Sequence, residues 1–272
     1  MIYNDGMFDY RIKPFEFSPD LVRQVWASFI YKQKHPNEKI KVTGSHNFPK
    51  EISKQFADEY IVNMDCEPTK TYDFLIDSFN RSYTPQEVSK SLAFPKAERE
   101  IDEKYVCFIP NLAERWHPST YDIDGRTTNA GGITVPFKYW LEYKKIVNDK
   151  GYKVYVMGNT FDVGYDNIPN YRDLGDYHLY KDTLDDPDFL YKQLKIMSNA
   201  ELTLGMGGGS YIAPIFGLPC ISSDVHYKLH FGNKTNLNNI HLDVFGNFGI
   251  SSTQQCFTMS DKFVKSCLDK RL

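Results

Sequence analysis

One stretch, from Ser198 to Ile221, constrains the fold more than any other part of the 272-residue chain: SNAELTLGMGGGSYIAPIFGLPCI. Its apolar run at 202–204 predicts a short strand, the glycines that follow predict a sharp turn, and the apolar residues after Tyr211 predict a helix. A second strand is predicted at 220–222. Strand, turn, helix and strand make one βαβ unit, and such a unit requires a parallel sheet.

The turn contains three consecutive residues without a Cβ atom, Gly207, Gly208 and Gly209, followed by Ser210. We call Gly207–Ser210 the glycine turn. Without Cβ atoms the backbone can approach a ligand closely, and Ser210 is suited to cap the helix. The first N–H groups and the positive end of a helix attract an anion, typically a phosphate. Because the turn follows a parallel strand, we expect it at the sheet edge where open α/β folds bind ligands.

The glycine turn matches neither of two common phosphate-binding motifs. No Lys-Ser/Thr pair follows the glycines, as a P-loop requires, and their order is not G-x-G-x-x-G. A turn of this composition can also serve only to pack a helix closely on its sheet. The residues by themselves leave both uses open.

Strands and helices alternate along most of the chain, which predicts an α/β fold with two Rossmann-like lobes on parallel sheets, the N-terminal lobe being the smaller. For the first lobe we expect a strand at 2–3, a helix from 18 to 35, a strand at 39–43, a helix at 48–57 and a strand at 60–62. For the second lobe we expect strands at 105–110, 152–157, 178–180, 202–204 and 220–222, helices at 136–148 and 187–200, and a polar loop from 111 to 132.

A mixed-charge run from Lys96 to Lys104 lacks an apolar face and predicts a solvated connector between the lobes. We therefore expect an N-terminal lobe at 1–100 and a C-terminal lobe at 101–259. Residues 260–272 are expected to form a terminal helix with a narrow apolar stripe. This helix either packs on its own domain or crosses back onto the first lobe.

Composition narrows the class of protein. The formal net charge is −3 and the isoelectric point is near 6.2, so the charge gives no global reason to bind nucleic acid, although a local basic patch stays open. No apolar run approaches the ~20 residues that span a bilayer, and we expect a cytoplasmic protein. The five cysteines are odd in number and have no C-x-x-C spacing, which favours neither a disulfide framework nor a zinc site.

The segment around the glycine turn resembles the donor-binding segment of GT-B glycosyltransferases, in which a helix follows a Gly/Ser-rich loop at the diphosphate of a nucleotide sugar. The pattern A-x-L-x-[IL]-G, small-residue loop, P-x-[FL]-G-x-P-x-[IV] recurs in heptosyltransferase-like enzymes and in a bacterial family of predicted glycosyltransferases. The likeness extends upstream through Tyr105–Phe108 and Gly151–Asn159, so it covers the C-terminal half of the chain.

This resemblance implies a glycosyltransferase that moves a sugar from a nucleotide-diphosphate sugar to an acceptor hydroxyl on a glycan, a lipid-linked molecule or another compound. The C-terminal lobe would bind the donor and the N-terminal lobe the acceptor. No cofactor is expected besides the donor, which is a co-substrate. The implied donor-binding residues lie at one expected sheet edge: Arg115, Arg126, Gly158, Asn159, Gly207, Gly208, Gly209, Ser210 and Tyr211.

Transfer with inversion needs a general base near the acceptor hydroxyl, and GT-B enzymes generally supply it from the N-terminal lobe. Asp5 and Asp9, which follow the first expected strand, are the candidate catalytic residues. His46, after the strand at 39–43, is a rival. None of the three belongs to a motif that selects it.

Two patterns that suggest metal binding are discounted, and we expect a metal-independent enzyme. Asp122 and Asp124 form a D-x-D pair, but in a polar loop rather than at the end of an apolar strand. Asp224, His226 and His230 offer ligands without a matching carboxylate or cysteine pattern.

Three alternatives to glycosyl transfer onto a small or lipid-linked acceptor stay open. The first is a nucleotide-sugar hydrolase or epimerase on the same fold. The second is a DNA-modifying glycosyltransferase, which would need a basic rim. The third is a non-catalytic module that binds a nucleotide.

Overall fold

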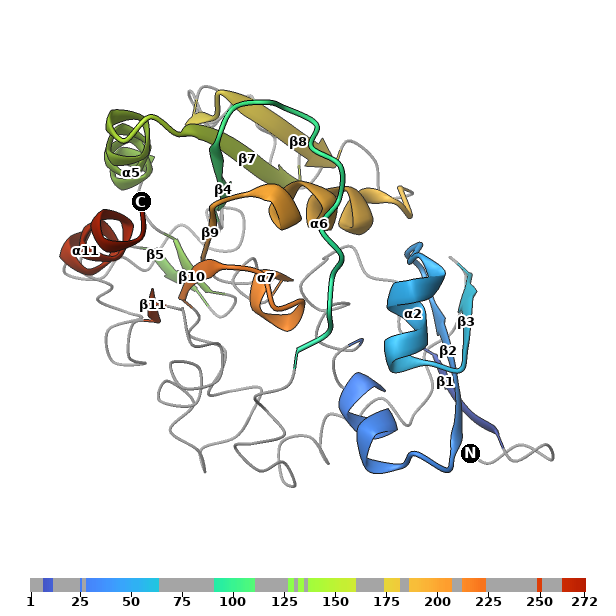
Figure 1. Cartoon of the computed structure of the whole chain (residues 1–272). Helices are drawn as coiled ribbons and strands as arrows, with labels where there is room; N and C mark the ends of the chain where they lie inside the picture. The colour runs from blue at the N-terminus through green and yellow to red at the C-terminus, as the bar shows by residue number, and fades with distance from the viewer. Residues whose placement is uncertain are drawn as a thin grey trace.

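The computed structural model describes residues 7–11, 25, 28–63, 91–110, 127–129, 132–134, 137–159, 174–181, 186–206, 212–223, 249–250 and 261–272. Within them the protein has two separate parallel sheets, one in each half of the chain (Figure 1). The expected α/β class with parallel sheets is therefore confirmed.

The large sheet contains six strands in the order β11-β10-β9-β4-β7-β8, and every neighbouring pair is parallel. Its strands are β4 (Tyr105–Ile109), β7 (Lys153–Asn159), β8 (Tyr177–Lys181), β9 (Leu202–Met206), β10 (Cys220–Ser223) and β11 (Gly249–Ile250). Numbered along the chain, this is the order 3-2-1-4-5-6 of a doubly wound Rossmann sheet.

Helices cover both faces of the large sheet. All five residues of β4 are buried. Because successive side chains of a strand point to opposite faces, both faces of the sheet must be covered. Tyr105 and Cys107 belong to the apolar cluster under α6 (Phe189–Asn199) and α7 (Ile212–Ile215). Val106 and Phe108 belong to the cluster under α5 (Phe137–Asp149) and α11 (Asp261–Arg271). The result is a three-layer arrangement.

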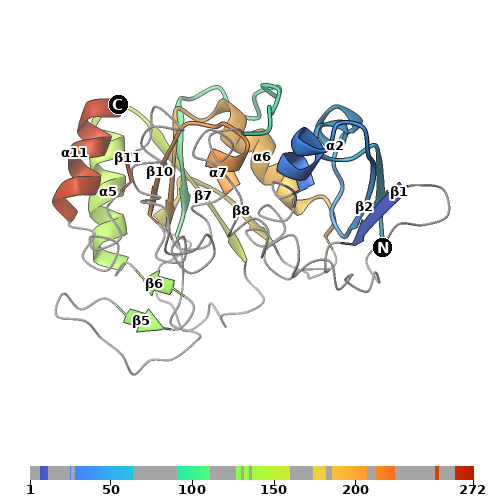
Figure 2. The same ribbon diagram turned by 90° about the horizontal axis from the view of Figure 1, so that it is seen from below.

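The terminal helix α11 packs against α5 within the second half of the chain. Lys265 Nζ donates to Glu142 Oε2 at 2.6 Å, and Lys150 Nζ donates to the carbonyl of Asp269 at 3.2 Å. Val264 and Leu268 form the apolar stripe beneath these polar contacts. Figure 2 shows α11 and α5 side by side at the end of the molecule opposite the small sheet. Of the two expected placements, α11 therefore has the one on its own domain, and it does not cross back onto the first lobe.

The small sheet contains three parallel strands in the order β1-β2-β3. Its elements are β1 (Met7–Arg11), β2 (Lys39–Gly44), α2 (Lys50–Phe56) and β3 (Glu59–Val62), and a helix that includes residues 28–34 precedes β2. The strand expected at 2–3 lies outside the described residues. Asp9 does not follow a strand as expected, because it lies within β1 and pairs with Lys41 of β2.

Three further expectations need correction. Part of the loop expected at 111–132 is a short antiparallel hairpin of β5 (Thr127–Asn129) and β6 (Gly132–Thr134). A sixth strand, β11, occurs where no strand was expected. Strand β9 continues two residues past the expected end, since Gly205 and Met206 still pair with β10.

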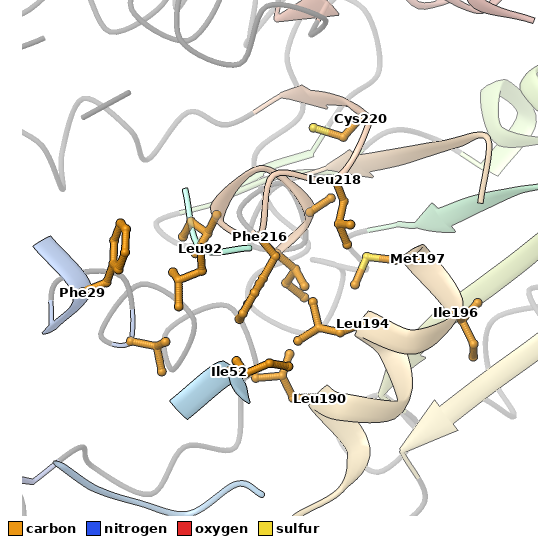
Figure 3. Packing of buried hydrophobic residues seen from close by; sticks show 14 of the residues in the cluster. Phe29, Ile52, Leu92, Leu190, Leu194, Ile196, Met197, Phe216, Leu218 and Cys220 are labelled. Carbon is orange, nitrogen blue, oxygen red and sulfur yellow. The ribbon is translucent and has the colours of Figure 1, made fainter. Parts of the chain in front are cut away.

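A single apolar cluster joins the two halves of the chain. Ile52 of α2 lies near Leu190 of α6, and Phe216, directly after α7, packs in the same group (Figure 3). The ring of Phe48, between β2 and α2, lies 6.4 Å from that of Phe216. The halves therefore share buried apolar surface rather than a polar gap.

The segment that joins the two halves, residues 91–104, is hydrogen-bonded to the second half at Leu92 and Ala97. Ala97 N–H donates to Ser198 Oγ at 3.1 Å, and Asn199 Nδ2 donates to the carbonyl of Ala97 at 2.7 Å. Leu92 N–H donates to the carbonyl of Ile215 at 2.8 Å. The run expected as a solvated connector, Lys96–Lys104, is mostly exposed, and Ala97 near its start is hydrogen-bonded to the end of α6.

Asp58 links the helix before β2 to the start of that strand. Its carboxylate accepts hydrogen bonds of 2.8 Å from Lys32 Nζ and from Ile40 N–H. Burial would raise the pKa of Asp58, but these bonds and the charges of Lys32 and Lys39 hold it below its ordinary value.

We expect Asp58→Asn to lower the free energy of unfolding by about 1 kcal/mol at pH 7, a modest value because solvent screens this half-exposed pair. A lowered folded-state pKa means that the stabilisation is complete above the unfolded-state value of about 3.9. It is lost as the pH falls through the lower folded-state value. Urea unfolding of both proteins from pH 7 to pH 3 should show the difference shrinking. A difference that stays constant would contradict this origin.

Candidate functional site

The order of the large sheet locates its candidate ligand site. Strands β4 and β9 are neighbours, with Ile109 opposite Gly205, but the chain leaves them in opposite directions. After β4 it crosses to β7, and after β9 it crosses to β10. Ligands of open α/β sheets bind outside the carboxyl ends of two such diverging strands.

The glycine turn starts at this point. Strand β9 ends at Met206, so Gly207 is the first residue past the carboxyl end of the strand. The segment that contains Arg115 leaves the carboxyl end of the adjacent strand β4 after Ile109. The structure thus brings together the origins of the two segments that the sequence assigned to donor binding.

Gly158 and Asn159 lie at the same edge of the sheet. They are the last two residues of β7, in register with Tyr180 and Lys181 of β8, and β7 neighbours β4. This is the place expected from the sequence. The remaining expected donor residues lie outside the described part of the chain: Arg115, Arg126, Gly207, Gly208, Gly209, Ser210 and Tyr211.

The helix after the glycine turn is short but firmly anchored. Ile212, Ala213 and Ile215 are buried. Its end is closed by a hydrogen bond from Leu218 N–H to the carbonyl of Ala213, with Gly217 at φ 64°. This is the Schellman pattern, and the left-handed residue there needs to be glycine. These contacts fix α7 on the sheet. They therefore also fix the first residue of α7, which the glycine turn precedes.

The strands under the site carry titratable groups that stay neutral. Burial raises the pKa of the Cys107 thiol well above its usual range, so this thiol is not a nucleophile at neutral pH. Burial likewise raises the pKa of Tyr155 to about 12. Neither of these two side chains therefore supplies a charge near this edge at neutral pH.

The segment that follows the carboxyl end of β2, in the first half of the chain, contacts the carboxyl edge of the large sheet. His46 lies two residues after β2 and is 2% exposed, with Ser45 Oγ 3.0 Å from its Nδ1. The next residue, Asn47, donates from its N–H to the carbonyl of Pro187 at 2.8 Å. Its Nδ2 also donates to Asp188 Oδ1 at 2.6 Å. Asp188 directly precedes α6, a helix that begins at the carboxyl edge of the large sheet.

No local pattern in the sequence pairs Asn47 with Asp188, because the two residues lie 141 positions apart. Asp5 lies outside the described residues, and Asp9 lies two residues before the carboxyl end of β1. In the described ranges no group of three or more His, Cys, Asp or Glu could hold a metal ion. Both discounted metal patterns, at 122–124 and 224–230, fall outside those ranges.

The sheet order defines a Rossmann-like α/β protein, and its strand switch point is the candidate ligand site. No protein-family model matches the sequence, and no curated protein matches it. Solved structures do match. The E. coli ADP-heptose LPS heptosyltransferase II is 9% identical with a TM-score of 0.53, over 97% of this chain and 98% of that chain.

Two other similar structures are an E. coli heptosyltransferase, WaaC, with ADP and a glycosyl transferase family 9 protein from Veillonella parvula. The first is 9% identical with a TM-score of 0.48, over 98% of this chain and 100% of that chain. The second is 9% identical with a TM-score of 0.47, over 97% and 95%. The fold comparison rests on heptosyltransferase II. The likeness to heptosyltransferase II shows a similar fold and extends over nearly the whole chain.

No helix among the described residues has both the length and the apolar character needed to cross a membrane.

Proposed function

We propose that the protein is a glycosyltransferase with two GT-B-like lobes, which moves a sugar from a nucleotide-diphosphate sugar to an acceptor hydroxyl. The observation that carries the proposal is the origin of the glycine turn at β9, beside β4, at the switch point of a Rossmann-ordered sheet. The fold likeness to heptosyltransferase II supports it.

In this proposal the donor diphosphate lies against the N–H groups of the glycine turn, and Arg115 and Arg126 neutralise its charge. Gly158 and Asn159 contribute from the end of β7. The acceptor oxygen attacks the anomeric carbon, the bond from that carbon to the diphosphate oxygen breaks, and the nucleotide diphosphate leaves. A base takes the acceptor proton. Asp5 and Asp9 are the proposed bases, and His46 is the rival.

A thermal-shift screen of nucleotide sugars tests the binding step. We expect one nucleotide class to raise the unfolding temperature, with a shift that grows with ligand concentration. Incubation with the bound donor then separates the alternatives. Free sugar without acceptor indicates a hydrolase, and an isomerised donor indicates an epimerase. Label transfer to duplex DNA indicates a DNA-modifying enzyme, and binding without any turnover indicates a non-catalytic module. No shift with any donor contradicts the proposal.

We expect turnover to be independent of divalent metal ions, because helix N–H groups and arginines are proposed to bind the diphosphate. The measurement is the initial rate of nucleotide release with and without excess EDTA. Equal rates are the expected result. If EDTA abolishes turnover and Mg²⁺ or Mn²⁺ restores it, the Asp122–Asp124 pair was dismissed wrongly.

A further inference from the structure

A short segment between β2 and α2, Ser45–Pro49, touches the second half of the chain at two separate helices. We call this segment the clasp. Its first contact is that of Asn47, which donates from its backbone to Pro187 and from its side chain to Asp188. The side-chain bond is 2.6 Å long and partly buried, and its acceptor is a carboxylate. Hydrogen bonds of this charge-assisted kind are the stronger ones in proteins.

The Asp188 side of this contact is held in place by its own surroundings. Asp188 N–H donates to Asp186 Oδ1 at 3.0 Å, and Asp186 Oδ2 accepts from Lys192 Nζ at 2.9 Å. The start of α6 is therefore ordered by contacts within the second half. Asn47 binds to a preformed acceptor rather than ordering a loose one.

The second contact of the clasp is that of Phe48. Its ring lies 5.5 Å from Phe56 and 5.6 Å from Tyr60 in the first half, and 6.4 Å from Phe216 in the second half. Phe216 directly follows α7, the helix that the glycine turn precedes. Two consecutive residues therefore reach the start of α6, at the proposed donor edge of the large sheet, and the opposite end of α7.

The clasp is also fixed to its own sheet. Tyr60 of β3 donates its hydroxyl to the carbonyl of His46 at 2.6 Å. Relative motion of two domains is the usual expectation unless their interface is large and hydrophobic. Here one buried apolar cluster continues from α2 through the clasp to α6 and α7. A continuous apolar interface of this kind resists hinge motion between the two halves.

We propose that Asn47 and Phe48 are positioning residues that lock the two sheets in their working orientation before any donor binds. The carboxyl end of the small sheet, with His46, is then preset against the donor edge rather than brought to it by hinge closure. Preset geometry of this kind lowers the entropic cost of bringing reactants together. The working role rests on the proposed function, whereas the lock itself depends only on the contacts above.

The test compares four proteins: wild type, Asn47→Asp, Asp188→Asn, and the double swap Asn47→Asp with Asp188→Asn. Asn47→Asp places two carboxylates at hydrogen-bond distance, and we expect the unfolding temperature to fall by about 4–8 °C. Small-angle X-ray scattering should show a larger radius of gyration. The double swap restores an amide–carboxylate pair in the opposite sense, and should recover at least half of the lost unfolding temperature.

The dissociation constant for a nucleotide separates two effects. General damage to the fold would change it, whereas loss of the contacts of the clasp would not. Isothermal titration with ADP and with UDP should give the same dissociation constant for Asn47→Asp as for wild type. Adding either nucleotide to wild type should leave its radius of gyration unchanged. Lys145→Ala, which removes the exposed pair of Lys145 with Asp149, is the matched control and should change none of these quantities.

Contraction of the wild type on nucleotide binding would overturn the proposal, because it would show closure by a hinge. An Asn47→Asp protein with unchanged unfolding temperature and scattering would overturn it too, as would a double swap no better than Asn47→Asp. If Asn47→Asp does not fold, Asn47→Ser removes the bond without adding charge and takes its place. If neither nucleotide binds wild type while the variants behave as expected, the donor site is wrong and the lock stands.

Discussion

Replacing Phe216 by alanine is expected to lower the free energy of unfolding by about 3–5 kcal/mol. Phe216 is buried, and its ring lies 6.4 Å from Phe48 of the first half and 6.1 Å from Phe94 of the segment that joins the halves. Removing it takes apolar contacts from three parts of the chain at once. Because each of those parts is held by its own hydrogen bonds, the cavity has little freedom to collapse. Urea unfolding measures the loss.

Two variants serve as controls for this prediction. Phe216→Leu keeps most of the buried volume and should cost clearly less than Phe216→Ala. Leu141→Ala removes a side chain of α5 that is 45% exposed, and should be close to neutral. If Phe216→Ala lowers the free energy of unfolding by less than about 1 kcal/mol, the apolar interface between the halves is not a packed core.

The large sheet could be predicted because its strands and helices have strong local signals. Apolar runs such as β4 and β9, each separated from the next parallel strand by a helix, define βαβ units from the sequence alone. The edge of the sheet that binds ligands follows from the same pattern, because every parallel strand ends there. Gly158 and Asn159 are at that edge, as expected.

The missed strands lack such signals. Strand β11 is the two residues Gly249–Ile250, and β5 is the polar run Thr127–Asn129. Both are too short for a periodic pattern, and their strand character comes from their pairing partners. The apolar stripe of α11 was predicted correctly. Its partner was not, because a stripe shows that a helix is covered without showing by what.

The contacts between the halves could not be predicted for a different reason. Asn47 and Asp188 are ordinary residue types for a loop and a helix start, so neither one indicates a distant partner in the sequence. Their pairing depends on how two separately folded sheets come together. Local sequence does not encode that relation, so the clasp became visible only in three dimensions.

The residues proposed to bind the donor remain predictions, and the glycine turn gives the sharpest test of them. We expect Gly208→Val to weaken binding of a nucleotide sugar at least ~10-fold, equivalent to about 1.4 kcal/mol. A branched Cβ would stand where backbone N–H groups are proposed to meet phosphate. Isothermal titration measures the affinity, and thermal unfolding without ligand measures the stability. The affinity should fall much more than the stability.

Gly151→Ala is the matched control, since Gly151 has a φ of 82° and open space where a Cβ would stand. It carries the backbone strain, of order 1–3 kcal/mol, without blocking a ligand, so its affinity should equal that of wild type. If Gly208→Val does not fold, Ser210→Ala removes only the cap and a phosphate contact, and replaces it. If a folded Gly208→Val protein binds the donor as tightly as wild type, the glycine turn only packs α7 on the sheet. The diphosphate must then bind elsewhere.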